Sequence, residues 1–321
     1  VLTIQSGQCS KLSTGSMLPG GADSVVMLEY CENIGDSEIE IRKPVAPGEN
    51  VMHQGEDCST CELVFSAGRK IRTQEIGLLS ALGFSQVPVF SKPVIGVITT
   101  GDELVDIDEN PAPGQIRDVN SYTLLSWIKS LDCRAKHYGI VGDCRSTLNQ
   151  MIQEAVQQCD LVLVTGGSSV GTRDITLDCF HELGNVYVHG VSISPGKPTI
   201  LANINNVPVF GLPGQVTSSL VVAIVLVVPF IRYISAETNF DHNLSYPTKT
   251  ATLGRNVSSK PGREDYVRVS LLEDENGCYH AFPLLGKSGL LNTMLEADGL
   301  LKIDSNSEGL KTGTTVQVII L

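Results

Sequence analysis

The sequence predicts an α/β protein of several domains, in which a doubly wound, mostly parallel central sheet lies between two β-rich regions. Between residues 91 and 235, runs of Val, Ile and Leu alternate with amphipathic segments. Such runs are typical of parallel strands that helices cover on both faces. Short apolar runs separated by Gly and Pro turns occur on either side. The length of 321 residues allows two or three domains at roughly 100–200 residues each.

Residues 1–90 form the first predicted domain, which is β-rich. Its strand candidates are residues 1–4, 24–28, 39–41 and 62–65. The domain closes with a predicted helix over residues 73–82, where apolar residues recur near helical spacing and Gly83 is a suitable stop. Because the chain begins at Val1 and within a strand candidate, we expect a fragment or a processed chain.

Residues 91–235 form the central predicted domain, with strands and helices in alternation. The strand candidates are residues 94–98, 161–164, 186–188 and 207–210, and the helix candidates are 121–131, 146–158, 175–183 and 217–233. Pro208 cannot donate to a ladder, so we expect it at the start or edge of its strand. The most apolar stretch is shorter than the ~20 residues that span a bilayer and contains Pro229, which favours a buried core helix.

Residues 236–321 form the third predicted domain and return to strand patterns. Residues 265–270 alternate well, and residues 279–282 and 315–319 are further strand candidates. Gly, Asn and Ser turns lie between them. A small β-barrel or a small sandwich fits this pattern.

The composition excludes several classes of function. A net charge of -12 argues against a nucleic-acid binder, which would show a basic face. The first residues lack the basic and apolar regions of a secretory signal. The nine cysteines are odd in number, and the one Cys-x-x-Cys (58–61) has no second ligand pair for zinc. We therefore predict a soluble cytoplasmic protein without a disulfide framework.

Four loops are expected at the carboxyl ends of the central strands, where open α/β sheets bind ligands. The first, residues 99–104, contains Asp102 and Glu103 beside hydroxyls and Gly101. Two carboxylates suit Mg²⁺, which prefers oxygen ligands, although a glycine turn capped by Asp102 is an equal alternative. In the second loop, residues 114–121, Asn120 or Ser121 would cap the next helix, and Asp118 or Asn120 could face a ligand.

The third loop, residues 165–174, places glycines and hydroxyls before a helix. Backbone N–H groups and the helix dipole would then point at a bound phosphate. The loop matches neither the Walker A nor the dinucleotide pattern, and Asp174 could be only a helix cap. The fourth region combines residues 194–199 with 211–215. Lys197, between Gly and Pro, suits a phosphate or another oxyanion, although a solvated lysine is also possible.

Short motifs occur in a fixed order along nearly the whole chain. They are Thr-Gly at 14–15 with Pro-Gly-Gly-Ala-Asp-Ser-Val-Val at 19–26, Pro-Gly-Glu-Asn-Val at 47–51 with Gly-Glu-Asp at 55–57, Thr-Gly-Asp-Glu-Leu at 100–104, Gly-Gln-Ile at 114–116, Gly-Gly at 166–167 with Ser-Val-Gly at 169–171, Pro-Gly-Lys-Pro at 195–198, Gly-Leu-Pro-Gly at 211–214 and Ala-Asp-Gly-Leu at 297–300. Each motif is modest, but the ordered set closely resembles the MoeA and gephyrin E-domain family.

The resemblance implies a homodimer with a central molybdopterin-binding α/β domain of the MoCF or MogA type, a β-rich domain and a C-terminal β-barrel. It implies a Mg²⁺-dependent transferase of molybdenum cofactor biosynthesis, whose substrates are adenylyl-molybdopterin and molybdate. Cleavage of the adenylate would release AMP while molybdenum passes to the dithiolene. This agrees with the loops, because a pyrophosphate linkage and a tetrahedral dianion both need anion sites.

The resemblance also implies roles for individual residues. Asp102, Asp174 and Lys197 are the expected catalytic residues, and Asp102, Glu103 and Asp174 are the expected metal ligands; Glu56 and Asp57 are further acidic candidates. The expected residues of the pterin and molybdate sites are Gly166, Gly167, Ser169, Asp143, Pro198, Arg263 and Ser288.

Some positions depart from the family pattern. Ser194 replaces a lysine, Thr172 replaces an acidic residue, and residues 215–218 read Gln-Val-Thr-Ser instead of Asn-Pro-Val-Ser. The family's N-terminal Asn-Ser-Ala-Met-Asp-Gly-Tyr-Ala motif is absent from this sequence. A non-catalytic relative that binds a pterin, a nucleotide or a protein partner is therefore the alternative. A protein that shares only the α/β module, of the CinA type, is a third reading, which the two flanking β-rich regions disfavour.

Overall fold

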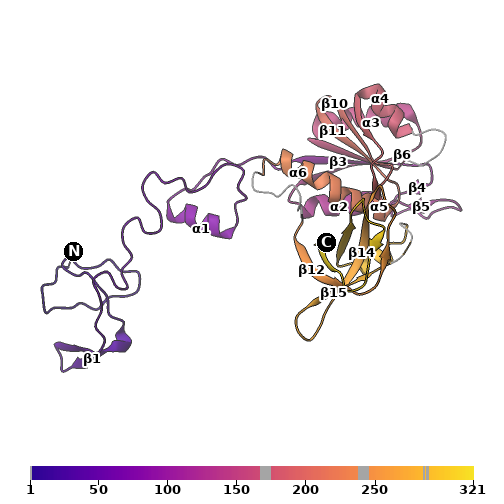
Figure 1. Cartoon of the computed structure of the whole chain (residues 1–321). Helices are drawn as coiled ribbons and strands as arrows, with labels where there is room; N and C mark the ends of the chain where they lie inside the picture. The colour runs from indigo at the N-terminus through magenta and orange to yellow at the C-terminus, as the bar shows by residue number, and fades with distance from the viewer. Residues whose placement is uncertain (1, 167–174, 238–245, 285, 287–288) are drawn as a thin grey trace. The chain divides into compact units, whose positions relative to one another are not determined.

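The computed structural model describes residues 2–166, 175–237, 246–284, 286 and 289–321. The chain divides into two compact units, Val1–Ser66 and Ala67–Leu321, and each is described by itself. Figure 1 traces both units from the N-terminus to the C-terminus. The domain boundaries at 90 and 235 stay predictions.

The first unit contains one antiparallel hairpin, formed by β1 (Cys31–Ile34) and β2 (Glu38–Ile41). A short 3-10 turn, η1 (Leu28–Tyr30), precedes it. The hairpin confirms the strand predicted at 39–41. The strands predicted at 1–4, 24–28 and 62–65 are wrong among the described residues.

Other contacts hold these three segments. Thr3 forms only an isolated bridge with Gly20. The Val25 amide donates to Glu49 O at 3.0 Å, and the carboxylate of Glu62 accepts from the Ser59 amide within a turn. An apolar run favours an extended backbone, but only a partner strand completes a ladder.

Helix α1 (Thr73–Ala81) confirms the predicted helix. Gly83 follows it at φ +82° and donates to Ser80 O, while the Phe84 amide donates to Leu79 O. These two hydrogen bonds form a Schellman stop, which needs a left-handed residue and therefore favours glycine at this position. At the other end, the buried Glu75 carboxylate accepts hydrogen bonds from the side chains of Arg69 and Arg72.

The central sheet has six strands in the order β6-β3-β7-β11-β10-β8. Their bounds are β3 Val94–Thr100, β6 Arg134–Val141, β7 Leu161–Gly166, β8 Asn185–His189, β10 Ile200–Ile204 and β11 Val207–Leu212. The first four strands of the order are parallel, and β10 is antiparallel to both of its neighbours, β11 and β8, so that β8 again runs in the direction of the first four. The prediction of a mostly parallel sheet is confirmed, although β6 and β10 were not predicted. Pro208 is the second residue of β11, as expected for a residue that cannot donate.

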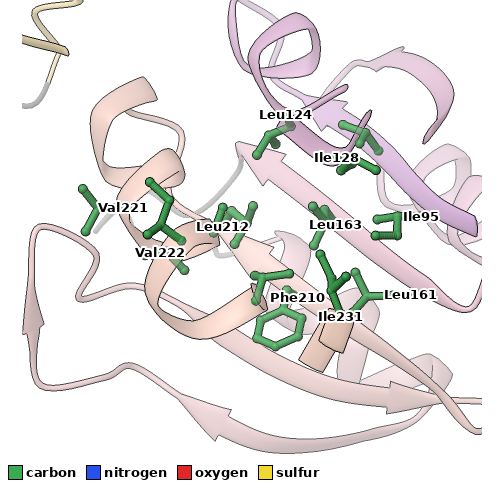
Figure 2. Packing of buried hydrophobic residues seen from close by; sticks show 14 of the residues in the cluster. Ile95, Leu124, Ile128, Leu161, Leu163, Phe210, Leu212, Val221, Val222 and Ile231 are labelled. Atoms are coloured by element: carbon green, nitrogen blue, oxygen red, sulfur yellow. The ribbon is translucent and has the colours of Figure 1, made fainter. Parts of the chain in front are cut away.

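The sheet is covered on both faces, and residues of β7 alternate between the two resulting cores. Leu161 and Leu163 pack with α2 (Asn120–Ser130) and with the apolar helix of residues 216–234, as Figure 2 illustrates. Val162 and Val164 pack with α3 (Arg145–Gln158) and α4 (Ile175–Leu183) on the other face. All four side chains are fully buried. Each such burial stabilises the fold by about 1.5–3 kcal/mol, which explains why the first four residues of β7 are all apolar.

The start of α2 corrects one expectation. The predicted cap was Asn120 or Ser121, but both belong to the helix itself. The buried carboxylate of Asp118 accepts a hydrogen bond from the Ser121 amide at 3.1 Å and takes the capping role. Capping requires an oxygen just before the first turn, and the helix begins one residue earlier than the sequence indicated.

The most apolar segment is one continuous helical stretch. It runs through α5 (Val216–Val222), a π-helical turn η2 (Ala223–Val227) and α6 (Val228–Ile234). By length and composition this 19-residue stretch could cross a membrane, yet 56% of it is buried. Val221, Val222 and Ile231 pack in the core against the sheet (Figure 2), which confirms the predicted core helix.

The C-terminal strands close into a five-stranded barrel, which decides between the barrel and the sandwich. The strands are β12 Thr248–Leu253, β14 Glu264–Glu273, β15 Tyr279–Pro283, β16 Gly299–Ile303 and β18 Thr315–Ile320. The order is β15-β12-β18-β16-β14, and β15 also pairs with β14. This last pairing removes the sheet edges. Shorter elements are β4 Leu104–Val105, β5 Ile116–Arg117, β13 Val257–Ser258, β17 Gly309–Leu310 and α7 Asn292–Leu295.

The barrel and the α/β sheet are joined by more than the connecting chain. Strand β9 (Ile193–Ser194), from the α/β region, pairs in parallel with the start of β14. Tyr266 and Leu300 of the barrel belong to the same buried cluster as α2 and the apolar helix. Residues near β9 and β14 are therefore held next to each other.

Candidate functional site

Two carboxylates lie at the carboxyl ends of the neighbouring strands β3 and β6. The Asp143 amide donates to Asp102 Oδ1 at 2.8 Å, and Thr100 Oγ1 donates to Asp143 Oδ1 at 3.2 Å. Asp102 therefore accepts a hydrogen bond from the loop of the adjacent strand, and its role as a Mg²⁺ ligand stays a prediction. Both aspartates are exposed, so oxygens remain accessible to a ligand.

Asp102 and Glu103, although adjacent, line different hollows. Asp102 lies with Asp106 and Glu109 around an acidic hollow of about 430 Å³. Glu103 lies in a larger cleft together with Lys197. Both residues lie in the turn between β3 and β4, which the Leu104 amide closes by donating to Gly101 O at 3.2 Å.

The end of β7 and the turn before α5 are held together by Asn120. Its Nδ2 donates to Thr165 Oγ1 at 2.9 Å and to Gly214 O at 2.8 Å. Gly166 ends β7 at φ +100°, and a Cβ there would lie 1.9 Å from Thr100 O. Only glycine fits so close to the next strand, so the wall of the cleft at this point is bare backbone.

Lys197 lies on a turn that is packed against the apolar helix. Gly196 precedes it at φ +128°, and a Cβ there would lie 2.5 Å from Val222 Cγ2. Thr199 Oγ1 donates to Gly196 O at 2.7 Å, and the Val191 amide donates to Lys197 O at 2.9 Å. The backbone of the turn is thus fixed, while the Lys197 side chain is exposed at the cleft.

One cleft of about 960 Å³ gathers these elements between the α/β sheet and the barrel. Its lining includes Gly166, Gly214 and residues 191–198 from the α/β region, and residues 260–263 from the barrel. Three of the described lining residues are cations, namely Lys197, Lys260 and Arg263, and the one carboxylate among them is Glu103. The cleft is therefore locally cationic, although the chain carries a net charge of -12. Such a site favours an anion.

Arg263 is held by the buried carboxylate of Asp265. Arg263 Nε lies 2.9 Å from Asp265 Oδ1, but neither atom has a hydrogen-bond partner. At that distance the N–H must point away from the oxygen, so this contact is an ion pair only. Arg263 Nη2 donates weakly to Asp265 Oδ2 at 3.4 Å, and Ser259 Oγ donates to the same oxygen at 2.8 Å.

The structure brings together some of the predicted site residues. Gly166, Lys197, Pro198 and Arg263 line one cleft with Glu103, and Asp102 and Asp143 form the neighbouring carboxylate pair. Gly167, Ser169, Asp174 and Ser288 lie outside the described residues. The catalytic and binding roles of all these residues stay predictions.

Sequence reasoning missed several lining residues. Lys260 lies in the cleft with Pro261 and Gly262, and its signal was the basic Lys-Pro-Gly-Arg turn at 260–263. Ser218 also lines the cleft, although it was noted only within a departure from the family pattern, whereas Gln215 belongs to the fourth predicted loop region. A turn from a distant domain reaches the cleft only through the tertiary fold.

The donor chemistry at this edge of the sheet fits a Mg²⁺ ion. Asp102 and Glu103 supply carboxylate oxygens, and Asp118 Oδ2 and Asn120 Oδ1 are buried acceptors without a hydrogen-bond partner. No group of three or more His, Cys, Asp or Glu side chains with metal-site geometry occurs in the described part of the chain. This still suits Mg²⁺, because proteins often hold it through one or two carboxylates plus substrate phosphates and waters.

Beside Asp143, Cys144 is an exposed thiol at the N-terminus of α3. Hydrogen bonds from the Ser146 side chain, and then from Thr147, lower the pKa of this thiol to about 7. Burial has the opposite effect on Cys133 and Cys179, and raises the pKa of each to about 11. All nine cysteines are free.

Comparison with known families matches the chain from end to end. A profile described as "MoeA N-terminal region (domain I and II)" covers residues 2–83. "Probable molybdopterin binding domain" covers residues 96–233, and "MoeA C-terminal region (domain IV)" covers residues 250–321. The fold and site thus define a protein with a molybdopterin-binding type of α/β domain between two further MoeA regions. A protein that shares only the α/β module is excluded.

Individual relatives agree with this class. A putative molybdopterin biosynthesis protein of Methanocaldococcus jannaschii is 36% identical over 99% of this chain and 77% of its own length. Molybdopterin molybdenumtransferase 1 of Mycobacterium tuberculosis is 30% identical over 99% of this chain and 75% of its own. The solved MoeA protein of Pyrococcus horikoshii has a TM-score of 0.80 at 36% identity, over 99% of this chain and 77% of that one. This chain belongs to the MoeA family of molybdopterin biosynthesis proteins.

Proposed function

We propose that this protein is a molybdopterin molybdenumtransferase, which inserts molybdenum from molybdate into adenylylated molybdopterin and releases AMP. The observation that carries the proposal is the cationic cleft between the sheet and the barrel. Relatives that match most of their own length are named molybdopterin molybdenumtransferases, which supports the same reaction.

The cleft has the chemistry that the two anionic substrates need. Molybdate is a tetrahedral dianion and suits Lys197 and Arg263. Backbone at Gly166 and Gly214 is open to a phosphate, because neither residue has a side chain and both line the cleft. Pro198 follows Lys197 and keeps that turn stiff. Binding both substrates in one cleft would bring the dithiolene and the molybdate together, which is a large part of the rate enhancement in such a reaction.

Mg²⁺ is part of this proposal. When bound, it would polarise a phosphoryl oxygen of the adenylate linkage. The described residues that would hold it are Glu103, which lines the cleft, or Asp102, which lines the acidic hollow. The Asp143 amide fixes one oxygen of Asp102, so the carboxylate is already oriented before a ligand arrives.

The test is molybdate-dependent release of AMP. The full chain is incubated with adenylyl-molybdopterin and Mg²⁺, with and without molybdate, and AMP is measured by chromatography. We expect release only with molybdate, and a loss of at least tenfold in Lys197→Met. Lys311→Met, which removes an exposed charge that does not line the cleft, is the matched control. If the wild-type protein binds the adenylate but releases no AMP, the enzyme proposal fails.

A second role, binding a protein partner without catalysis, is favoured by one feature. An apolar groove of about 530 Å³ is lined by Trp127, Leu220, Ile224, Leu291 and Leu295, among others. The Leu295 side chain is 84% exposed, and exposed apolar surface of this kind marks interaction sites. The AMP assay decides between the roles, because a binding protein would retain the ligand without turnover.

We further propose that the protein acts as a homodimer in the cytoplasm. The dimer follows from the resemblance to the family. Light scattering after gel filtration measures it directly. A dimer would give about twice the mass of the 34.4 kDa chain, and a single-chain mass at micromolar concentration would contradict it.

A further inference from the structure

The turn at residues 260–263 is a rigid part of the barrel. The Gly262 amide donates to Ser305 O at 2.8 Å, and the Ser259 amide donates to Glu308 O at 2.8 Å. The side chain of Ser259 donates in addition to the buried carboxylate of Asp265. Both ends of the turn are therefore tied to the barrel, so the position of Lys260 in the cleft is set by the fold.

The same turn is also tied to the opposite wall of the cleft. The Glu264 amide donates to Ser192 O at 2.9 Å, and Asp265 lies opposite Ser194 in the β9–β14 pairing. This pairing begins directly after Arg263 and ends three residues before Lys197. The turn at residues 260–263 and the turn that carries Lys197 come from different domains and both line one cleft. The β9–β14 pairing fixes their positions relative to each other.

The charges of the cleft are not equally available. Arg263 is paired with Asp265, which offsets its charge. Neither Lys197 nor Lys260 forms an ion pair with any residue that the structure describes. Two uncommitted lysines therefore supply the positive charge that a dianion requires, one from each wall.

We propose that Lys260 is a further oxyanion-binding residue, which acts with Lys197 to hold a tetrahedral dianion in the cleft. Arg263 lies beside it, and Asp265 positions the Arg263 guanidinium. The inference rests on the proposed function for the identity of the anion, molybdate. It adds a residue from the barrel to the binding site and explains why the cleft is built from two domains.

The test measures binding of molybdate alone, without pterin, by equilibrium dialysis at fixed ionic strength. We expect Lys260→Met to raise the Kd by at least tenfold, which corresponds to about 1.4 kcal/mol. Lys260→Arg should recover most of the affinity, because it retains the charge. Lys311→Met is again the matched control, with the same loss of charge from the barrel, and should bind like the wild type. Circular dichroism confirms that each variant is folded.

The outcomes separate this inference from the proposed function. If the wild type binds molybdate and Lys260→Met binds it equally well, the role of Lys260 is overturned while the transferase proposal is untouched. If Lys260→Met weakens molybdate binding but the wild type releases no AMP, the role of Lys260 in binding the anion is supported and the proposed transferase reaction fails. If Lys260→Met and Lys311→Met weaken molybdate binding equally, the effect comes from the net charge of the protein and not from a specific contact. This result would overturn the inference.

Discussion

At the residue scale, local hydrogen bonds decide which side chains are chemically available. Asp102 and Asp143 are linked to each other through a backbone amide, and Asp265 is committed to Arg263. Lys197 and Lys260, by contrast, form no ion pair within the described residues. Among the cations that line the cleft, the two without an ion pair to a described residue are therefore these lysines, even in a chain that is acidic overall.

Cys144 gives a prediction of pH dependence. The thiolate is the nucleophile in alkylation, and hydrogen bonds lower the pKa of the Cys144 thiol to about 7. Because the thiol is protonated below this pH and ionised above it, we expect its alkylation rate by iodoacetamide to rise through pH 7 and to level off above about pH 8. Peptide mass spectrometry after timed labelling measures this rate at Cys144.

The matched variant for this prediction is Ser146→Ala. Its hydroxyl lies 3.3 Å from Cys144 Sγ and is the largest cause of the low pKa. Removing it should move the midpoint of the alkylation profile to higher pH. A midpoint that does not move would assign the low pKa to the helix N-terminus instead.

At the element scale, the ends of helices and strands carry the site. Strand β7 has glycine at residue 166 because the neighbouring strand leaves no room for a side chain, and α2 begins where Asp118 caps it. The sequence predicted these elements closely, since apolar periodicity reports which segments are buried. It missed β6, in which only the last residue, Val141, is buried, and it misplaced the cap of α2 by choosing the nearest polar residue.

The cap of α2 can be tested directly. Asp118→Ala removes the acceptor for the Ser121 amide, and we expect it to lower the free energy of unfolding by about 1 kcal/mol. Asp118→Asn retains an acceptor oxygen and should lower it by less. Urea unfolding followed by circular dichroism measures both. Asp36→Ala, at an exposed position in the hairpin turn, should leave the stability unchanged, and equal stability of Asp118→Ala would contradict the capping role.

At the scale of the whole molecule, the α/β sheet and the barrel share buried contacts. Leu300 of the barrel is fully buried in a cluster that also holds Leu124 and Val221. Trp127, the one tryptophan in the sequence, packs against this cluster from α2, and its indole donates to Tyr246 Oη at 3.0 Å. Packing across this boundary fixes the two walls of the cleft.

Because the two regions share this core, we predict that a substitution in the barrel also destabilises the α/β domain. Leu300→Ala should lower the free energy of unfolding by about 2–5 kcal/mol. The midpoint of the unfolding transition measured by Trp127 fluorescence should shift to a lower denaturant concentration. The midpoint measured by circular dichroism should shift with it. Tyr187→Ala, at a position 67% exposed, is the control and should change neither. A fluorescence transition that stays unchanged in Leu300→Ala would show that the two regions unfold independently.

The sequence by itself determined four of the six strands of the central sheet, the core helix and the residues of the candidate loops, because burial imposes a periodicity that each segment carries locally. Only the tertiary structure decided that the C-terminal strands close into a barrel, since closure depends on the β14–β15 pairing. It also decided which cations share a cleft. Lys197 and Lys260 both line it because β9 pairs with β14, and a pairing between segments so far apart leaves no periodic signal in either one.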